Sequence, residues 1–372
     1  MNQTSIFPVV PRPELDRLLE YMPGLSLEQI RRQYGLTKVV KLASNENPFG
    51  PSPKGMKAYK DVVENLFRYP DSRSLDLRRM LATKFHKDVQ EIIIGAGSDE
   101  IIELLAKAYL SPFDEVVVSE SSFLQYRIAA ELMGARAIVV PQKDLKQDLR
   151  AMAAAATKRT KFVFIANPNN PTGTYNNRSE VDEFLSALPA HVVPVFDEAY
   201  FEYAETNKDY PSIAEEFFRK RPMVVLRTFS KAFGLAGLRV GYGIGPEPFV
   251  RALDKIKPPF NVSVPAQAAA AAALFDEVHI KKTVKVNESE REKLATELTG
   301  MGFAVVPSAA NFILFQVKPW TGRLLFERLL HEGVVARSVD EYGLPDYLRI
   351  TVGQPNENKI FLKALREVVN NK

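Results

Sequence analysis

The chain has 372 residues, enough for two domains, and its 49 Lys and Arg residues nearly balance 45 Asp and Glu residues, for a formal net charge of +4. It has no basic run typical of a nucleic-acid or membrane-binding patch. The absence of cysteine excludes disulfides, thiolate nucleophiles and cysteine-based metal sites. The longest apolar stretch, Ala266 to Phe275, is too short to span a bilayer. Because the first residues carry no secretory or transit signal, we expect a soluble cytoplasmic protein.

Residues 1–40 are irregular and proline-rich, which indicates an N-terminal arm that packs on the small domain or on a partner subunit. The chain then alternates short apolar, β-branched runs with helical patterns, which predicts an α/β fold with a mostly parallel sheet flanked by helices. We expect seven strands, at residues 91–94, 115–118, 135–140, 161–166, 192–196, 223–227 and 240–244. Helices are expected at residues 99–109, 124–133, 178–188 and 213–219.

Two domains are predicted on this pattern, a large one over residues 41–265 and a small α+β domain over residues 266–372. Three prolines, the last of them Pro265, interrupt the chain between them, ahead of an alanine-rich helix. In the small domain we expect helices at residues 288–299, 322–331 and 357–369 and strands at residues 303–306, 311–315 and 347–351.

Unusual polar residues follow the strand-like runs, at the carboxyl ends where open α/β sheets bind ligands. The first run leads into Gly95-Ala-Gly-Ser-Asp-Glu and a helix, whose unpaired N–H groups suit an anion. A tight turn capped by Ser98 or Asp99 explains this motif equally well. The fourth run ends in Asn167-Pro-Asn-Asn-Pro-Thr-Gly, where the Asn170 amide can donate to an anionic phenolic oxygen, although most Asn-Pro pairs are only turns.

Two further runs end in ionisable groups. Asp197 follows a run that reads as buried, so its carboxylate needs a cationic or hydrogen-bonding partner, and a helix cap or internal ion pair is the alternative. Lys231 lies among small and apolar residues, a setting that desolvates an amine as Schiff-base lysines require, although most lysines are solvated surface charges. Thr228, Ser230 and Arg239 add two hydroxyls and a guanidinium that fit a phosphate dianion.

One cofactor needs this combination of groups, and it is pyridoxal 5′-phosphate. We expect Lys231 to form an imine with it, Asp197 to pair with the ring nitrogen, and the other groups to hold the phosphate and the phenolate. Phe123, after the second run, is a candidate for stacking on the ring, with a core aromatic as the alternative. The four histidines are dispersed, so no metal site is expected.

The order of these residues resembles the class I/II aminotransferases of the fold-type I pyridoxal-phosphate enzymes. The resemblance extends to the histidinol-phosphate aminotransferase branch and runs from about Tyr21 to the C-terminus. It implies the fold of that family, with residues 41–265 as the cofactor-binding domain. The segments that carry it are Lys41-Leu-Ala-Ser-Asn-Glu-Asn-Pro, Arg68-Tyr-Pro-Asp, Pro168-Asn-Asn-Pro-Thr-Gly, Val195-Phe-Asp-Glu-Ala-Tyr and Tyr347-Leu-Arg-Ile-Thr-Val-Gly.

The resemblance also implies roles around the cofactor. Ser98 and Asp99 would cradle its phosphate, Asn170 would contact the phenolate, and Tyr200 would lie on the phenolate side of the ring as a catalytic residue beside Lys231 and Asp197. Tyr69 would reach the phosphate of the neighbouring subunit's cofactor, which implies a homodimer with shared active sites.

For the substrate, the resemblance places Arg349 on the carboxylate of glutamate or 2-oxoglutarate and on the phosphate of histidinol phosphate. Arg337 is a second candidate for that anion, with a surface or inter-lobe ion pair as the alternative for either arginine. Tyr21 resembles an arm residue that closes over the substrate, and Asn47 belongs to the substrate-binding set.

The expected reaction converts L-histidinol phosphate and 2-oxoglutarate to imidazole acetol phosphate and L-glutamate, a step of histidine biosynthesis. An aromatic amino-acid aminotransferase is the alternative, because Phe123 stands where many relatives have Tyr and the phosphate turn reads Gly-Ser-Asp-Glu rather than Gly-Ala-Asp-Glu. A Rossmann dehydrogenase is disfavoured, since Glu100 occupies the third glycine position of that motif. A ligand-sensing regulator is disfavoured because the sequence contains no evident DNA-binding extension.

Overall fold

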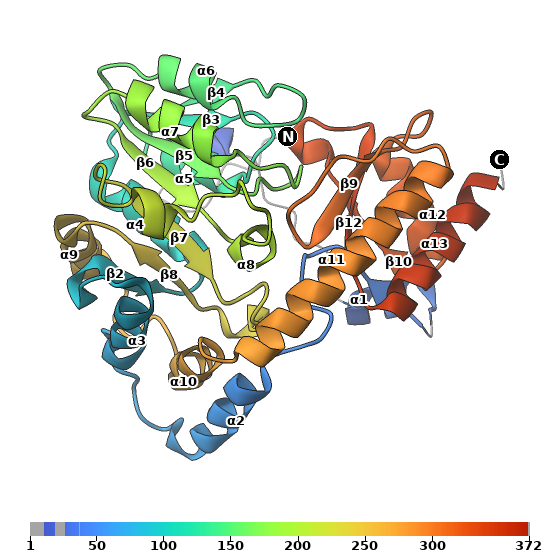
Figure 1. Cartoon of the computed structure of the whole chain (residues 1–372), viewed down its shortest axis with the longest axis horizontal. Coiled ribbons are helices and arrows are strands. Elements are labelled where there is room, and N and C mark those ends of the chain that lie inside the picture. Colours follow the sequence, from blue (N-terminus) through green and yellow to red (C-terminus); the bar gives the residue numbers. More distant parts are fainter. Residues whose placement is uncertain (1–10, 19–26, 37, 371–372) are drawn as a thin grey trace, which may run out of the picture.

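The computed structural model describes residues 11–18, 27–36 and 38–370, which fold into two lobes, each built around its own sheet. The long helix α11 (Glu277–Gly300) runs from the larger lobe to the smaller one (Figure 1). No helix in these residues is long and apolar enough to cross a membrane.

The larger lobe contains a seven-stranded sheet in the order β2-β8-β7-β6-β5-β3-β4. Every strand is parallel to the others except β8, which is antiparallel to both of its neighbours. The expected α/β fold with a mostly parallel sheet is therefore confirmed. The strands are β2 (Ile92–Gly95), β3 (Glu115–Ser119), β4 (Arg136–Val140), β5 (Thr160–Ala166), β6 (Val193–Asp197), β7 (Val224–Thr228) and β8 (Gly241–Ile244).

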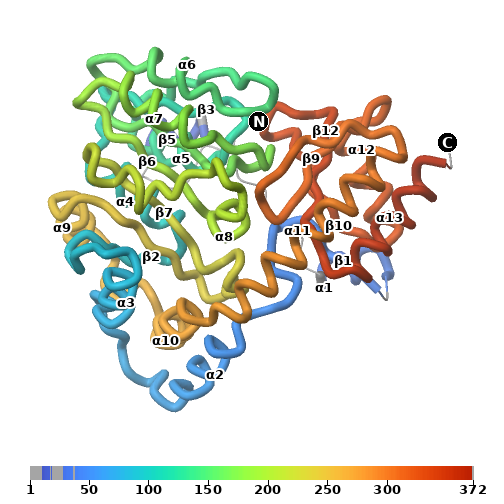
Figure 2. The backbone as a smooth tube through the Cα atoms, viewed as in Figure 1, coloured from blue at the N-terminus to red at the C-terminus, as the bar shows by residue number. Residues whose placement is uncertain are grey.

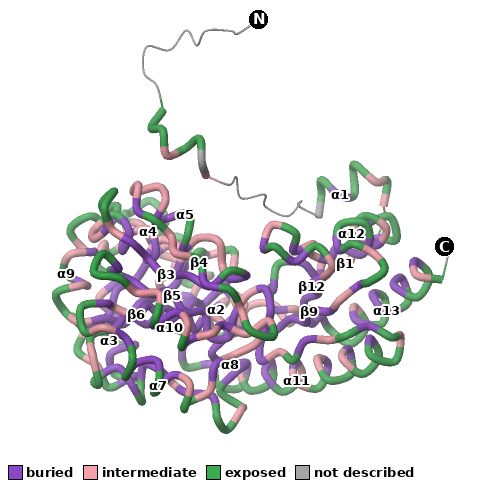
Figure 3. Tube along the Cα trace, turned by 90° about the horizontal axis from the view of Figure 1, so that it is seen from above, coloured by how far each residue is buried: buried purple, intermediate pink, exposed green. Residues whose placement is uncertain are grey.

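Helices cover both faces of this sheet because its central strands carry aliphatic and aromatic side chains on both sides, and these must be buried on each face. One core contains side chains from α3, α6, α7 and α10, and the other from α4, α5 and α9. Figure 3 shows the buried segments gathered inside the lobes. These helices are α3 (Leu75–Phe85), α4 (Ser98–Tyr109), α5 (Gln125–Leu132), α6 (Leu149–Ala154), α7 (Arg178–Ala187), α9 (Glu247–Ile256) and α10 (Val264–Ala273).

The smaller lobe has a three-stranded antiparallel sheet in the order β11-β12-β9, packed against α11, α12 and α13. A separate two-stranded parallel sheet pairs β1 with β10. Although they come early in the sequence, α1 and β1 lie against this lobe (Figure 2). The elements are α1 (Leu27–Tyr34), β1 (Val40–Lys41), β9 (Phe312–Gln316), α12 (Gly322–His331), β10 (Val334–Val335), β11 (Arg337–Ser338), β12 (Tyr347–Thr351) and α13 (Pro355–Asn370).

The remaining elements are short and lie between these strands and helices. They are η1 (Pro13–Arg17), α2 (Pro53–Asp61), η2 (Val63–Asn65), η3 (Val89–Glu91), α8 (Phe201–Ala204), η4 (Ile213–Phe217), η5 (Ala236–Leu238) and η6 (Asp340–Tyr342).

Three of the expected elements were wrong in detail. The helix expected at residues 288–299 begins much earlier and is the long helix α11 (Glu277–Gly300). The helix expected at residues 213–219 is only a five-residue π-helical turn, η4. The strand expected at residues 303–306 pairs with β9 only through the isolated bridge between Val305 and Phe315, and Pro307, which has no N–H to donate, follows it directly.

The alanine-rich helix α10 packs in the larger core rather than with the smaller lobe. Its small side chains allow a close approach to α2, where a Cβ on Gly55 would lie 3.0 Å from the Ala269 carbonyl oxygen. Leu42, by contrast, is buried in the core of the smaller lobe. We therefore propose that the division between the domains falls after α10 rather than at residue 265, and that the chain crosses to the small lobe near β1.

Candidate active site

The carboxyl ends of β5, β6 and β7 and the facing side of the smaller sheet enclose a cavity of about 700 Å³. Most of the predicted site residues line it, from both lobes. They are Ser98, Asp99, Phe123, Asn170, Asp197, Tyr200, Thr228, Ser230, Lys231, Arg239, Arg337 and Arg349.

One end of the cavity is built to hold an anion. Gly97 precedes α4 with φ +84°, and a Cβ there would lie 2.6 Å from Nη2 of Arg239. Gly241 of β8 likewise leaves room for the backbone of Ser98, because a Cβ at position 241 would lie 2.6 Å from the Ser98 nitrogen. The two glycines therefore let the start of α4, with its unpaired N–H groups, approach a guanidinium.

Hydroxyl groups complete this end of the cavity. Arg239 donates to Ser230 Oγ at 3.4 Å and to Asp99 Oδ2 at 3.2 Å, and Thr228 Oγ1 donates to Ser230 Oγ at 3.0 Å. Burial raises the pKa of Asp99, although the positive charges of Arg239 and Lys231 oppose that shift. A guanidinium, two hydroxyls and a helix start together suit a phosphate.

Asp197, at the end of β6, presents a buried carboxylate to the cavity. Its Oδ2 accepts a hydrogen bond from the Tyr126 hydroxyl at 2.7 Å, and its Oδ1 accepts one from the Ala199 backbone at 3.1 Å. Burial raises the pKa of Asp197 to about 6, while the hydrogen bond from Tyr126 opposes the rise. Since both partners are neutral, the site suits a cationic ring nitrogen.

Lys231 follows β7 and lines the cavity. Its Nζ lies 3.4 Å from the Ser44 carbonyl oxygen and 5.5 Å from the ring centroid of Tyr200. The Tyr200 hydroxyl accepts a hydrogen bond from Asn45 Nδ2 at 2.9 Å. The Lys231 amine thus lies beside the Ser44 carbonyl and the ring of Tyr200, and Asn45 holds the Tyr200 hydroxyl in place.

The smaller lobe contributes two arginines, Arg337 of β11 and Arg349 of β12, which lie directly opposite each other in the antiparallel pair. Arg349 is buried and donates to Asn170 Oδ1 and, at 2.8 Å, to the Ala43 carbonyl. Arg337 pairs with Glu341. Two guanidinium groups on neighbouring strands favour an anionic substrate at this wall.

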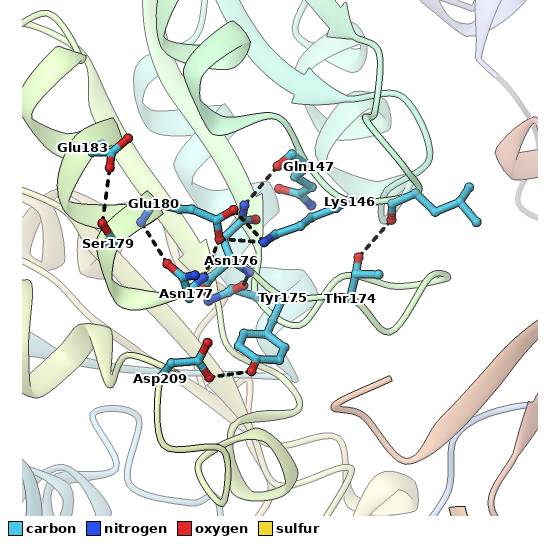
Figure 4. Close-up of polar contacts among 12 residues, drawn as sticks. Lys146, Gln147, Thr174, Tyr175, Asn176, Asn177, Ser179, Glu180, Glu183 and Asp209 are labelled. Atoms are coloured by element: carbon cyan, nitrogen blue, oxygen red, sulfur yellow. Dashed lines mark hydrogen bonds and ion pairs between the residues drawn. The ribbon is translucent and has the colours of Figure 1, made fainter. Parts of the chain in front are cut away.

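The loop that carries Asn170 is fixed by polar contacts just beyond it (Figure 4). Asn176 Nδ2 donates to the Gln147 carbonyl at 3.0 Å, and Lys146 forms an ion pair with Glu180 at 2.6 Å. The first contact ties the end of the loop to the turn before α6, and the ion pair ties that turn to α7.

Two of the predicted residues that the structure describes, Asn47 and Tyr69, are not among those that line the cavity. Asn47 is buried and donates to the Ala232 carbonyl at 2.9 Å and to Thr283 Oγ1 at 3.3 Å, so its amide fixes the chain after Lys231. Tyr69 is 81% exposed and stacks on Phe260 with ring centroids 4.6 Å apart. Tyr21 lies outside the described residues.

Two cavity residues, Tyr126 and Asn45, were missed by the sequence prediction. Tyr126 comes three residues after Phe123, which places both side chains on the same side of the chain at the start of α5, and that spacing was the available signal. Asn45 lies in the segment after Lys41 but has φ +55°, a backbone conformation that the sequence alone does not reveal.

The fold and this site define an enzyme of the aminotransferase type, and the comparisons with known proteins agree. The family described as Aminotransferase class I and II matches residues 37–365, so the chain belongs to that family. This membership confirms the family that the sequence motifs indicated.

Individual relatives are similar along nearly the whole chain. The histidinol-phosphate aminotransferase of Moorella thermoacetica is 43% identical over 350 residues, which cover 94% of this chain and 90% of that protein. Histidinol-phosphate aminotransferase 2 of Carboxydothermus hydrogenoformans is 44% identical, covering 96% and 99%. The crystal structure of histidinol-phosphate aminotransferase from Sinorhizobium meliloti in complex with pyridoxal-5′-phosphate superposes with a TM-score of 0.89 at 29% identity, covering 99% of both chains.

Proposed function

We propose that this protein is a pyridoxal 5′-phosphate-dependent aminotransferase that moves the amino group of L-histidinol phosphate to 2-oxoglutarate. The observation that carries the proposal is the joint placement of Lys231, Asp197 and Arg239 around one cavity. The chain that carries them is 43–44% identical to two proteins named histidinol-phosphate aminotransferase. The paired arginines of the smaller lobe supply the reason for an anionic substrate.

The residues at the cavity fit the cofactor. Gly97 has no side chain where one would fill the space beside Arg239, so Arg239, Ser230, Thr228 and the start of α4 would hold the phosphate. Asp197, buried with neutral partners, would pair with the ring nitrogen. When bound, the cofactor supplies an electron sink that makes the Cα proton of the substrate acidic.

The phenolate side of the ring would be held by an amide and a hydroxyl. The side-chain oxygen of Asn170 accepts a hydrogen bond from the Arg349 guanidinium. The NH2 group of Asn170 therefore points away from Arg349 and can donate elsewhere. Tyr200 accepts from Asn45, so its own hydroxyl hydrogen is available to donate toward the phenolate. Phe123 lines the cavity and would stack on the ring face.

Lys231 is the group placed to move the proton. Lys231 lines the cavity, where it would anchor the cofactor and then, as a free amine, take the proton from the substrate Cα. Tyr200 beside it keeps one side of the amine covered by an aromatic ring. A single lysine thus serves as anchor and as base.

Arg349 and Arg337 would bind the anionic end of each substrate. Their opposed positions on β12 and β11 place two guanidinium groups where one phosphate dianion, or the carboxylate of a dicarboxylic acid, can be met by several N–H donors. One wall of the cavity can therefore serve both halves of the reaction.

The purified protein tests this function directly. We expect the absorbance band of an imine between pyridoxal phosphate and Lys231, loss of that imine band in Lys231→Ala, and a kcat/KM for histidinol phosphate well above that for phenylalanine. A parent protein that shows no such band, even after addition of the cofactor, would refute the cofactor assignment. A clear preference for phenylalanine would instead favour the aromatic aminotransferase.

We also propose that the enzyme is a homodimer with shared sites. Apolar and aromatic side chains around Tyr69 are exposed, with Phe67 at 75%. Beside Phe67, the side chains of Leu66, Tyr69 and Phe260 line a hollow. Such a patch is typical of an interface between subunits. If Tyr69 completes the partner's site, inactive Tyr69→Ala and Lys231→Ala subunits should regain activity when mixed and allowed to exchange, and no recovery would contradict the sharing.

A further inference from the structure

Tyr126 and Asp197 share a hydrogen bond at the floor of the cavity. The phenolic hydroxyl of Tyr126, on α5, donates to Asp197 Oδ2 at 2.7 Å, and both residues are buried and line the cavity. The other carboxylate oxygen is held by the backbone of Ala199 at 3.1 Å. The carboxylate is thus fixed at both oxygens by neutral donors.

The ring of Tyr126 has little freedom to move. It stacks on Phe164 of β5 with centroids 5.0 Å apart and planes 8° from parallel, and it meets the edge of Phe123 at 5.5 Å and 81°. Because aromatic contacts of this kind fix a ring in the core, the hydroxyl is held at one point beside Asp197. The same ring also supports Phe123, the residue placed to stack on the cofactor.

The charges around the pair explain what this hydroxyl does. Besides burial, the charge of Asp99, on α4, raises the pKa of Asp197, and the charge of Lys231, in the loop after β7, lowers it. Tyr200 also raises the pKa of Tyr126. Burial keeps the pKa of Tyr126 well above its usual range, so the hydroxyl stays a donor throughout the working pH. A fixed donor favours the ionised form of a buried carboxylate over the protonated form.

We propose that Tyr126 is a positioning residue that acts through Asp197, keeping its carboxylate ionised and oriented toward the ring nitrogen of the cofactor. The identity of that ring rests on the proposed function, but the contact between Tyr126 and Asp197 belongs to the chain itself. Tyr126 touches no substrate in this scheme. Its effect is carried by the charge state of Asp197.

Tyr126→Phe tests the proposal, since it removes one oxygen and keeps the stacked ring. In the cofactor-free protein, NMR titration of carbon-13-labelled aspartate, assigned with Asp197→Asn, should show a higher pKa for Asp197 than in the parent. Pyridoxal phosphate should bind about tenfold more weakly, as expected for loss of a hydrogen bond to a charged group. Tyr175→Phe is the matched control, because its hydroxyl also donates to a carboxylate, Asp209 at 2.6 Å, and neither residue lines the cavity. That variant should change neither quantity.

A double-mutant cycle separates positioning from a merely structural role. In an Asp197→Asn background, Tyr126→Phe should no longer weaken cofactor binding, because the group through which it acts has lost its charge. An effect that persists in that background, or an unchanged Asp197 pKa in Tyr126→Phe, overturns the proposal. If the parent binds no pyridoxal phosphate, the proposed function fails, whereas the titration of the cofactor-free protein still tests the link between Tyr126 and Asp197.

Discussion

The guanidinium of Arg349 donates a hydrogen bond to the side-chain oxygen of Asn170, which joins β12 of the smaller lobe to the loop after β5 of the larger one. A second bond from Arg349, to the Ala43 carbonyl at 2.8 Å, reaches the segment that links β1 to the larger lobe. One arginine thus connects the two walls of the cavity. A substrate anion that binds Arg349 contacts both lobes through it.

Arg349→Gln should lower kcat/KM by about 100-fold for both histidinol phosphate and glutamate, because a buried charge for the substrate anion is lost while a shorter, neutral polar side chain remains. Steady-state kinetics with each substrate measure the effect. Arg323→Gln is the control: this side chain also lines the cavity, but it is exposed and pairs with Glu327 at 3.3 Å, so little change is expected. Equal kinetics for the parent and Arg349→Gln would contradict a role in substrate binding.

The raised pKa of Asp197 makes a prediction for stability. Its folded pKa of about 6 lies above the ordinary value of 3.8, so the cofactor-free fold favours the protonated form, and ionisation costs stability as the pH rises from about 4 to 6. Asp197→Asn removes that cost. It should stabilise the cofactor-free protein by up to about 3 kcal/mol at pH 8 and by little at pH 4.

Urea unfolding of the parent and of Asp197→Asn at several pH values measures this difference. Asp148→Asn serves as a control, because this half-buried carboxylate only caps α6, through the Ala151 nitrogen at 2.9 Å. A stability gain from Asp197→Asn that is the same at pH 4 and pH 8 would show that Asp197 has its ordinary pKa in the folded protein.

Much of the large sheet could be predicted because its strands are continuous β-branched and aromatic runs, as in β5 (Thr160–Ala166). Asp197 and Lys231 could be placed at one edge, since parallel strands end on the same side. The role of Tyr126 could not, because it depends on how α5 is rotated against β5. Asn47 was assigned to the substrate from its segment, but its direction is fixed by the remote partners Ala232 and Thr283.

Gly97→Ala tests the anion end of the cavity. At φ +84° an alanine is strained, and its Cβ would lie 2.6 Å from Nη2 of Arg239, so the guanidinium must move. We expect weaker binding of pyridoxal phosphate and a loss of about 1–3 kcal/mol in the free energy of unfolding. Gly300→Ala, in a helix with open space around it, should leave cofactor binding unchanged. Parent-like affinity in Gly97→Ala would argue that the phosphate lies elsewhere.

Beneath the site, Glu198 and Arg227 form an ion pair at 2.8 Å with side chains 0% and 2% exposed. The guanidinium also lies over the ring of Phe201, 3.4 Å from its centroid. Burial raises the pKa of Glu198, while the charge of Arg227 opposes that shift, so the carboxylate depends on its partner. Glu198→Gln removes the carboxylate that is hydrogen-bonded to this buried cation and leaves only the charge of buried Glu202 acting on it, so it should destabilise the protein by about 3–5 kcal/mol.

Chemical unfolding of the cofactor-free protein measures the effect of Glu198→Gln. Glu180→Gln is the matched control, because it breaks a partly exposed ion pair with Lys146 and should cost about 1 kcal/mol or less. Adding Arg227→Met to Glu198→Gln should recover part of the loss, since the buried charge is then removed. If Glu198→Gln costs no more than Glu180→Gln, Arg227 must find another partner in the core, and the pair is not what holds β6 and β7 together below Asp197 and Lys231.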